Sequence, residues 1–342
     1  MADRVTIVDV AHRAGVAISS VSSALNDRPG VSEQTRARII AAANELGFVP
    51  SLRGRSLSGK KAFAVGLVVH REPDVLELDP FFASFIGGIE SVLDKQGYAL
   101  VLQIGAEPGE MLNRYRRLAG DRRVDGVFLS EIEIDDPRIP LLQDLALPAV
   151  AINADDGSPF PTVRQDGDAG IRSIIDYLVD AGHTRIAHVA GPEHFVHARQ
   201  RRNAWSQALT DVGLEQGAVA AGGFTYEGGA QAATELLGLQ ARPTAVVCAN
   251  DLSAIGFIAE AQRMGFDVPK DVSVTGYDGI QLGSYVTPTL TTLRTSPRQI
   301  GAMAARLLLD VVNGDADAGP VVDVEIEPVE LVVRESTAEA PH

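Results

Sequence analysis

Cysteine is nearly absent from this 342-residue chain. The one cysteine, Cys248, lies in an apolar run, so no disulfide framework can form and we predict a small buried thiol. No apolar run approaches the length of a membrane span, and the first residues lack the apolar stretch of a secretory signal. We therefore expect a cytoplasmic protein with no membrane partner.

Recognisable catalytic motifs are also absent. The sequence has no phosphate-binding loop, no Gly-x-Gly-x-x-Gly after its first predicted strand, and no Gly-x-Ser-x-Gly elbow. Its seven histidines are scattered, without metal-ligand spacing on an evident helix. These absences argue against an enzyme, and we predict neither a cofactor nor a metal site.

Basic charge is scarce overall but concentrated at the start of the chain. Residues 1–61 hold nine Lys or Arg and five Asp or Glu, a net charge of about +4. The whole chain carries −15, so the remainder carries about −19. A basic head on an acidic body is suited to phosphate contact by the head alone.

The head predicts a first short helix with clear ends. Thr6, followed three residues later by Asp9, is a capping-box-like start. Apolar residues then recur at helical spacing, and Gly15 is expected to end the helix in a left-handed conformation.

Two further helices are expected in the head. The second runs over residues 18–25, with Val21, Ala24 and Leu25 inward and its serines outward. The third begins at Ser32 and ends at Gly47. Three helices this short, on a basic module, are typical of placing one helix in the major groove of DNA. A small helical bundle for protein contacts is the alternative.

The head resembles the DNA-binding headpiece of the lactose-repressor/galactose-repressor family of bacterial transcription regulators. The matching residues are 6–11, 14–16, 21–22, 25–26, 31–32, 35–36, 46–48 and 55–57. This motif is long and specific.

The resemblance implies which residues meet DNA. Ile18 and Ser19 would open the recognition helix and approach base edges. Arg55 and Leu57 would lie in a hinge helix, where Leu57 wedges into the minor groove and kinks the duplex. Family positions that hold the phosphate backbone are occupied by Thr6, Ser20, Ser22, Asn26 and Thr35.

Three residues depart from the family pattern. Ala17 replaces the usual capping serine, so the second helix lacks a side-chain acceptor at its start. Ser23 replaces a frequent arginine and removes a bidentate guanine contact, which contributes about 1–3 kcal/mol. Gly54 costs the hinge helix about 1 kcal/mol relative to alanine. We expect the hinge to fold only on the operator.

From residue 62 on, short apolar runs alternate with amphipathic stretches of helical length. This alternation predicts parallel sheets covered on both faces, with ligands beyond the carboxyl ends of the strands. The apolar runs include 63–69, 99–104, 124–129, 149–152, 186–190, 245–248 and 272–276. The helical stretches include 82–96, 169–181, 202–212, 228–237 and 252–264.

The resemblance extends through this body, in residues 79–82, Asp166 with Gly170, 181–187, 250–251 and 274–278. It implies an α/β fold: a three-helix helix–turn–helix headpiece and hinge helix, then a two-lobed periplasmic-binding-protein-like core of doubly wound parallel sheets. The expected domains are 1–49 for the headpiece, 50–61 for the hinge and 62–342 for the core. Lobe one would span about 62–163 plus 293–324, and lobe two about 164–292 plus 325–342.

The same match suggests effector-binding residues in the cleft between the lobes. Arg201, Asn250 and Asp278 fall at positions that bind ligand hydroxyls, and Phe224 falls where an aromatic ring packs on the ligand. The edge of the cleft adds His70, Phe81 and Asn153.

Each of the main effector candidates also has a purely structural explanation. Asn250 could cap the next helix, Asp278 could cap a turn, and Arg201 lies in a basic run of a kind that is usually solvated. We interpret Asp251 as mainly structural and Trp205 as core packing.

The function implied is ligand-gated repression by a homodimer on a pseudo-palindromic double-stranded DNA operator. The effector is expected to be a sugar, with a purine or nucleoside, or a phosphorylated metabolite, as alternatives. Corepression is the alternative to induction. From other classes, a solute-binding receptor or an α/β enzyme remains, but the headpiece argues against both.

Overall fold

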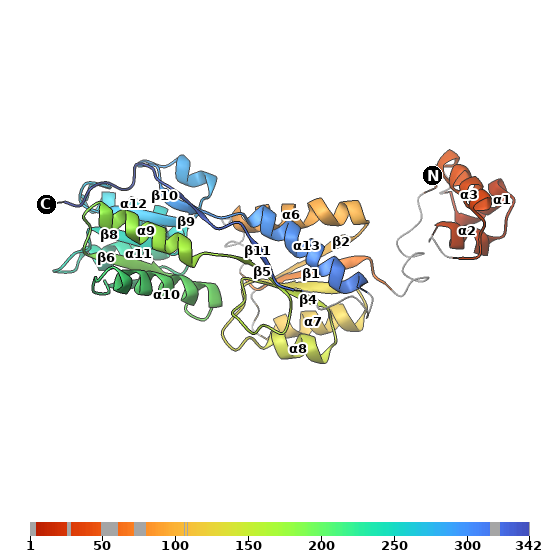
Figure 1. Ribbon diagram of the computed structural model, residues 1–342, viewed down its shortest axis with the longest axis horizontal. Coiled ribbons are helices and arrows are strands. Elements are labelled where there is room, and N and C mark those ends of the chain that lie inside the picture. Colours follow the sequence, from red (N-terminus) through yellow and green to blue (C-terminus); the bar gives the residue numbers. More distant parts are fainter. Residues whose placement is uncertain are drawn as a thin grey trace. The chain divides into compact units, whose positions relative to one another are not determined.

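The computed structural model describes residues 5–25, 29–48, 61–71, 80–105, 107, 109–314 and 322–341. It divides into a headpiece unit, Met1–Phe63, and a core unit, Ala64–His342 (Figure 1). Within the described residues, no helix has the length and apolar character needed to span a bilayer.

The headpiece unit begins with α1 (Ile7–Ala14), whose two ends form as predicted. The amide of Thr6 donates to Asp9 Oδ2 at 2.8 Å, and the Thr6 hydroxyl donates to the same oxygen at 2.7 Å. These bonds lower the pKa of the Asp9 carboxyl. Gly15 ends the helix at φ 65°, and its amide donates to carbonyls of the last turn.

Helices α2 (Ile18–Leu25) and α3 (Glu33–Glu45) complete this unit. The Ser32 hydroxyl caps α3 by accepting from the amide of Thr35 at 3.3 Å. The predicted apolar faces are confirmed, since one small core is formed by Val10, Ala11, Ala14, Val21, Ala24, Ile39, Ala42 and Ala43. Leu25 is only partly buried at its edge.

The first lobe of the core is a parallel six-stranded sheet, in the order β11-β5-β4-β3-β1-β2. Its strands are β1 (Ala64–Val69), β2 (Ala99–Ile104), β3 (Gly126–Leu129), β4 (Ala149–Ile152), β5 (Thr162–Gln165) and β11 (Val324–Ile326). One face is covered by α6 (Pro80–Gln96) and α13 (Pro297–Asn313), and the other by α7 (Glu110–Gly120) and α8 (Arg138–Asp144), as Figure 1 shows.

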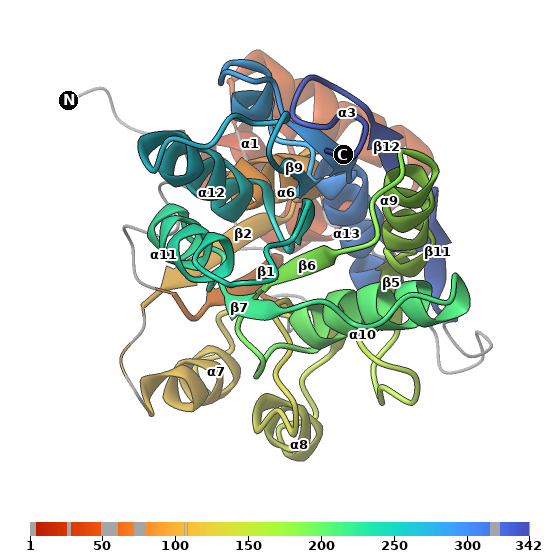
Figure 2. The same ribbon diagram turned by 90° about the vertical axis from the view of Figure 1, so that its left-hand side faces the viewer.

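The second lobe repeats this plan in the order β12-β10-β9-β8-β6-β7. Its strands are β6 (Ile186–Ala190), β7 (Val219–Ala221), β8 (Ala245–Cys248), β9 (Ser273–Asp278), β10 (Thr291–Arg294) and β12 (Glu330–Val332). Helices α11 (Tyr226–Leu237) and α12 (Asp251–Arg263) cover one face, and α9 (Asp168–Asp180) and α10 (Val196–Asp211) the other (Figure 2). A 3₁₀ turn, Gln281–Ser284, follows β9.

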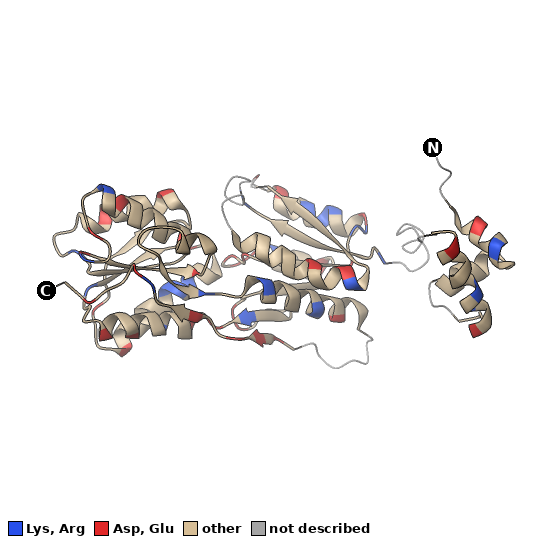
Figure 3. Ribbon diagram, turned by 90° about the horizontal axis from the view of Figure 1, so that it is seen from above, with Lys and Arg blue, Asp and Glu red and all other residues tan. Residues whose placement is uncertain are grey.

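The chain passes between the lobes three times, after β5, after β10 and after β11. The predicted fold class is therefore confirmed, with one exception to parallel pairing, because β12 runs antiparallel to β10. The predicted lobe boundaries were wrong by two residues at each crossing: residues 164–165 and 325–326 belong to the sheet of lobe one, and residues 293–294 to the sheet of lobe two. Acidic residues lie on helices of both lobes (Figure 3), so the negative charge of the core is shared between them.

One predicted helix start was wrong. Helix α10 begins at Val196, six residues before the predicted start at 202. The sequence of 196–201 is mostly polar, which concealed the helical period, and this error bears on the site described below.

Each lobe joins two helices at a glycine contact. An ideal Cβ on Gly88 of α6 would lie 2.1 Å from the carbonyl oxygen of Arg298 on α13, and one on Gly301 would lie 2.1 Å from that of Phe85. In lobe two, Gly229 and Gly256 make the same reciprocal contact between α11 and α12, at 2.0 Å in both directions. The backbones therefore pack directly against each other, with no room for a side chain.

We predict that Gly88→Ala lowers the free energy of unfolding by about 1–3 kcal/mol, because the new methyl group forces α6 away from α13. The neighbouring Gly87→Ala is the matched control. It meets no atom within 4 Å and should gain up to about 1 kcal/mol of helix propensity. Urea denaturation measures both, and equal stability of the two variants would contradict the packing argument.

Candidate functional site

The described DNA-binding candidates lie along α2 and at the starts of α1 and α3. Ile18 is the first residue of α2 and is 49% exposed, and Ser19 beside it is also exposed. Ser20 and Ser22 are partly exposed on the same helix. Thr6 immediately precedes α1, and Thr35 lies in the first turn of α3. Asn26, Arg55 and Leu57, and the departure at Gly54, lie outside the described residues.

The core unit has a pocket between its lobes, of roughly 630 Å³ including its open mouth. Six of the seven effector candidates line it: Phe81, Asn153, Arg201, Phe224, Asn250 and Asp278. The other residues that line the pocket were not predicted from the sequence: Arg71, Phe82, Ser130, Glu131, Ile152 and His197.

His70 is the candidate that does not line the pocket. It follows the last residue of β1, and successive side chains of an extended segment point to opposite sides. The next residue, Arg71, lines the pocket instead.

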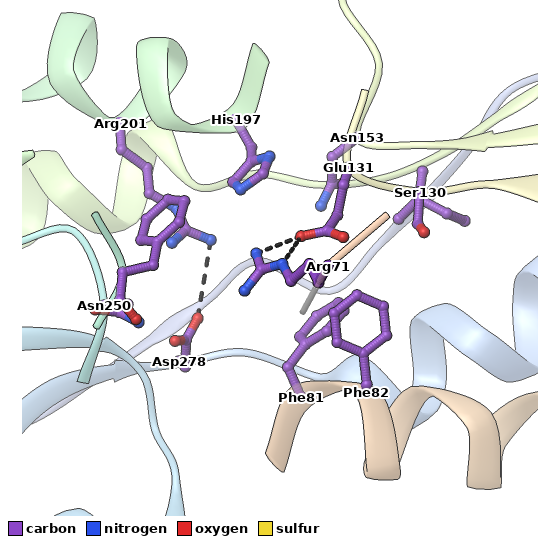
Figure 4. Close-up of a pocket in the computed structure, with 12 residues that line it drawn as sticks. Arg71, Phe81, Phe82, Ser130, Glu131, Asn153, His197, Arg201, Asn250 and Asp278 are labelled. Carbon is purple, nitrogen blue, oxygen red and sulfur yellow. Dashed lines mark hydrogen bonds and ion pairs between the residues drawn. The ribbon is translucent and has the colours of Figure 1, made fainter. Parts of the chain in front are cut away.

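Arg201 and Asp278 form the charged part of lobe two, as Figure 4 shows. Their side chains are 3.8 Å apart and each is 16% exposed. The guanidinium group donates to the carbonyl oxygen of Ala249 at 2.6 Å and lies 3.7 Å from the ring centroid of Tyr277. Arg201 is thus held inside the cleft, whereas its neighbour Arg199 is 42% exposed and pairs with Asp155 at 2.7 Å.

The side chain of Asn250 is hydrogen-bonded to the backbone of Phe224. The Asn250 Nδ2 donates to the carbonyl oxygen of Phe224 at 3.0 Å, while its Oδ1 caps α12 by accepting from the amide of Ser253 at 3.0 Å. Asn250 is therefore both a helix cap and a lining residue. Gly191 makes room for the ring, because a Cβ there would lie 2.2 Å from it.

Arg71 and Glu131 form a second ion pair, on lobe one, with side chains 13% and 11% exposed. Arg138 lies beneath them, fully buried, and donates to the carbonyl oxygens of Ser130 at 3.0 Å and Glu131 at 2.8 Å. It pairs with Asp136 at 2.6 Å. Burial by itself raises the pKa of the Asp136 carboxyl, but the hydrogen bonds and charge of Arg138 outweigh it and hold that pKa below its ordinary value.

Four lining residues have backbone conformations that side chains rarely adopt. Their φ angles are 50° at Glu131, 50° at Asn153, 62° at Phe224 and 121° at Asp278. Each residue lies at or just beyond the carboxyl end of a strand. Such strain costs of order 1–3 kcal/mol per residue and concentrates at ligand sites, where the surrounding structure enforces it.

His197 was missed because of the wrong start of α10. In the observed helix it precedes Arg201 by four residues and shares its face, so a correct boundary would have indicated it. Its ring stacks on Phe224 at 5.3 Å. Burial, followed by the charges of Arg201 and Arg71, holds the pKa of His197 well below its ordinary value, so the ring is neutral at pH 7.

Three interpretations of structural residues are confirmed. Asp251 is buried and accepts from the amide of Ile280 at 2.8 Å, which holds the turn after Asp278. Trp205 is buried and stacks on His188 at 5.3 Å. Cys248 is buried in the core of lobe two, where burial raises the pKa of its thiol.

Comparison with known proteins gives matches for both units. The profile of bacterial regulatory proteins of the lacI family matches residues 6–51, and that of the periplasmic binding protein-like domain matches residues 175–337. The HTH-type transcriptional repressor CytR of Escherichia coli (strain K12) is 33% identical, over 98% of this chain and 97% of its own. The HTH-type transcriptional repressor PurR of Photobacterium profundum is 32% identical, over 97% and 98%.

Solved structures of similar fold also match nearly the whole chain. A lac repressor dimer bound to operator and the anti-inducer ONPF has a TM-score of 0.83 at 28% identity, over 98% of this chain and all of that chain. The complex of the transcriptional regulator CelR with cellobiose has a TM-score of 0.74 at 32% identity, over 97% and 100%.

A helix–turn–helix headpiece joined to a two-lobed core with a pocket defines a DNA-binding regulator of transcription with an effector-binding core. The chain belongs to the lacI family of bacterial regulatory proteins. The relatives named above are regulators rather than enzymes.

We predict that Arg138→Met lowers the free energy of unfolding by about 3–5 kcal/mol, because it leaves the Asp136 carboxylate buried without its cation. Adding Asp136→Asn to this variant should recover part of the loss, since the uncompensated charge is then gone. Chemical denaturation at pH 7 compares the three proteins. A single variant within about 1 kcal/mol of the parent would contradict this role for the pair.

Proposed function

We propose that this chain is a repressor that binds a pseudo-palindromic operator as a homodimer, and that an uncharged polyhydroxylated ligand, a sugar first of all, controls that binding from the pocket. The Arg201–Asp278 pair beside Phe224 carries the ligand part of this proposal. As a repressor of transcription, the protein would act on the nucleoid, in the cytoplasm.

Ile18 and Ser19 are assigned to base edges, because both are exposed at the start of α2. Thr6, Ser20, Ser22 and Thr35, with Asn26 beyond the described residues, are assigned to phosphates. Arg55 and Leu57 are assigned to a hinge at residues 50–61, between a headpiece at 1–49 and the core. The operator-bound lac repressor dimer supports two-fold binding of this kind.

The charge balance of the pocket supports an uncharged ligand. Each described guanidinium group that lines it is paired with a carboxylate, Arg71 with Glu131 and Arg201 with Asp278. A phosphate group would place negative charge beside those carboxylates. A sugar instead offers vicinal hydroxyls that a carboxylate and a guanidinium can grip together, and an apolar face for an aromatic ring.

A nucleoside is the second candidate, because it combines a diol with a ring. The CelR–cellobiose complex favours the sugar. For either ligand we propose induction: the ligand binds the arrangement of the lobes that has low operator affinity. By linkage it must then bind the DNA complex more weakly than the free protein.

We predict that Ile18→Ala relaxes the preference for the operator over unrelated DNA by about tenfold, because it removes an apolar contact with a base edge and discrimination at one base pair is worth about 1–3 kcal/mol. Ile40→Ala is the matched control, since Ile40 is 43% exposed on α3 and has no assigned contact. A band-shift titration on palindromic DNA from the protein's own promoter region measures both. Failure of the parent protein to bind any such DNA would remove the repressor assignment.

We also predict that Asp278→Asn keeps operator affinity but loses release by ligand. The isosteric amide cannot accept hydroxyl hydrogen bonds as a carboxylate does, whereas the headpiece is unchanged. Asp267→Asn, an exposed carboxylate outside the pocket, should respond as the parent does. Band shifts with a panel of sugars and nucleosides give the readout. Normal release by Asp278→Asn would show that the ligand does not bind at Asp278.

A further inference from the structure

We infer that the two lobes are joined by a latch made of their own backbones, and that this latch favours the arrangement of low operator affinity. The latch is formed by residues 132–134 of lobe one, after β3, and residues 194–196 of lobe two, at the start of α10. Its effect on operator binding rests on the proposed function, whereas its effect on the lobes does not.

The latch is a short antiparallel bridge between the lobes, in which Glu133 lies opposite Phe195. The amide of Ile134 donates to the carbonyl oxygen of His194 at 2.8 Å. On the other side of the bridge, the amide of Val196 donates to the carbonyl oxygen of Ile132 at 2.9 Å. Two bonds that flank an opposed pair in this way are the pattern of a regular antiparallel sheet. The two lobes are therefore joined in a defined register.

The latch also supplies a cap that α10 otherwise lacks. Val196 is the first residue of α10, and Phe195 before it makes no side-chain hydrogen bond to the helix. The first amides of a helix have no partner within the helix. Lobe one provides an acceptor for the Val196 amide through the carbonyl oxygen of Ile132. All three residues are less than 10% exposed, at 5% for Ile132, 9% for Phe195 and 4% for Val196, so little water competes for the bond.

Contacts within lobe one shape its side of the latch. The amide of Glu133 donates to Asp136 Oδ2 at 3.0 Å. The buried Arg138, which pairs with Asp136, donates to the carbonyl oxygen of Glu131 at 2.8 Å. Glu131 and Asp135 have positive φ angles, of 50° and 54°. Such conformations persist only where the surrounding structure enforces them. Lobe one thus holds this segment in the conformation that pairs with lobe two.

A second contact between the lobes lies about one turn further along α10. Asp155, in the segment between β4 and β5 of lobe one, pairs with Arg199 at 2.7 Å and accepts from Gln200 Nε2 at 2.9 Å. The same helix carries His197 and Arg201, which line the pocket. One helix therefore connects the pocket with both contacts, and it cannot move away from lobe one without breaking them.

The latch consists of protein groups alone, because neither its residues nor Asp155 line the pocket. The lining residues come from both lobes, so the latched arrangement is the one that brings them together. The apparent affinity for a ligand is proportional to the population of the arrangement that binds it. Under the proposed induction, the same arrangement has low operator affinity. The latch therefore sets both the apparent ligand affinity and the operator affinity of the free protein.

The test is a disulfide across the latch of the full-length protein, between cysteines introduced by Ile134→Cys and His194→Cys. These positions are opposite each other beside the Glu133–Phe195 pair, and both side chains are exposed. Opposed residues of this kind have Cα atoms about 5.5 Å apart, within the range of about 4.4–6.8 Å that a disulfide spans. The native Cys248 is buried and does not compete.

The matched control combines Ile134→Cys with Gln207→Cys, an exposed position on α10 roughly 16 Å beyond Val196 at the rise of an α-helix. With oxidised glutathione, we expect the latch pair to form an intramolecular disulfide at least about tenfold faster than the control pair, which is out of bonding range. Band shifts on palindromic promoter DNA should then show operator binding at least about fivefold weaker for the oxidised latch pair than for its reduced form. Dithiothreitol should restore it.

Asp155→Ala, in the otherwise native chain, tests the second contact. It should tighten operator binding by about two- to fivefold, because losing one exposed ion pair between the lobes favours their separation. A substitution that only damaged the fold would not raise operator affinity. Asp156→Ala is the matched control, because the Asp156 carboxylate is fully exposed and its partner at 3.7 Å, Arg164, lies in the same lobe. It should bind operator as the parent does.

The inference is overturned if the latch pair oxidises no faster than the control pair. It is also overturned if the oxidised latch pair binds operator as tightly as its reduced form, or more tightly. Unchanged operator binding by Asp155→Ala would remove the second contact from the mechanism. If no form of the protein binds operator, the proposed function fails, whereas the relative rates of disulfide formation still show whether the lobes are latched.

Discussion

The parallel direction of the strands is the constraint on which the rest of the core depends. All strands of a parallel sheet end at the same edge, so residues distant in sequence arrive together there without any specific attraction between them. Glu131, Asn153, Asn250 and Asp278 reach the pocket from four strands in this way. The antiparallel strand β12 lies at the outer edge of its sheet and contributes no lining residue.

The fold then has to hold charged and strained groups at that edge. Desolvating Arg138 and Asp136 is costly, and the cost is offset only because the guanidinium also satisfies the carbonyl oxygens of Ser130 and Glu131. Asp251 has a similar role under the turn after Asp278. In both lobes a buried polar side chain thus holds the backbone that presents a carboxylate to the pocket.

The headpiece was predictable almost to the residue, because its helices are specified by short-range signals: the Thr6–Asp9 cap, Gly15, and the Ser32 cap. The core was predictable as apolar runs and as a family resemblance, which also identified the lobe-two half of the site. On lobe one it identified Phe81 and Asn153 but missed the Arg71–Glu131 pair. Arg71 and Glu131 are 60 residues apart, and their pairing depends on the register of β1 and β3, which no local pattern encodes. Which of His70 and Arg71 faces the pocket was also not predictable. Both residues follow the last residue of β1, where the alternation of side chains along a strand no longer specifies their direction.

The division of the site between two lobes bears on regulation. A ligand shifts an equilibrium only through a difference in its binding free energy between two states. If the recognition groups all lay on one lobe, the ligand would bind equally well whatever the separation of the lobes, and it would shift nothing. Because Arg201 and Asp278 lie on one lobe and Arg71 and Glu131 on the other, a ligand that contacts both pairs would gain much of its binding free energy only when the lobes are correctly spaced. A coupling of about 1–3 kcal/mol, typical of allosteric proteins, therefore needs no more than one or two hydrogen bonds that depend on that spacing.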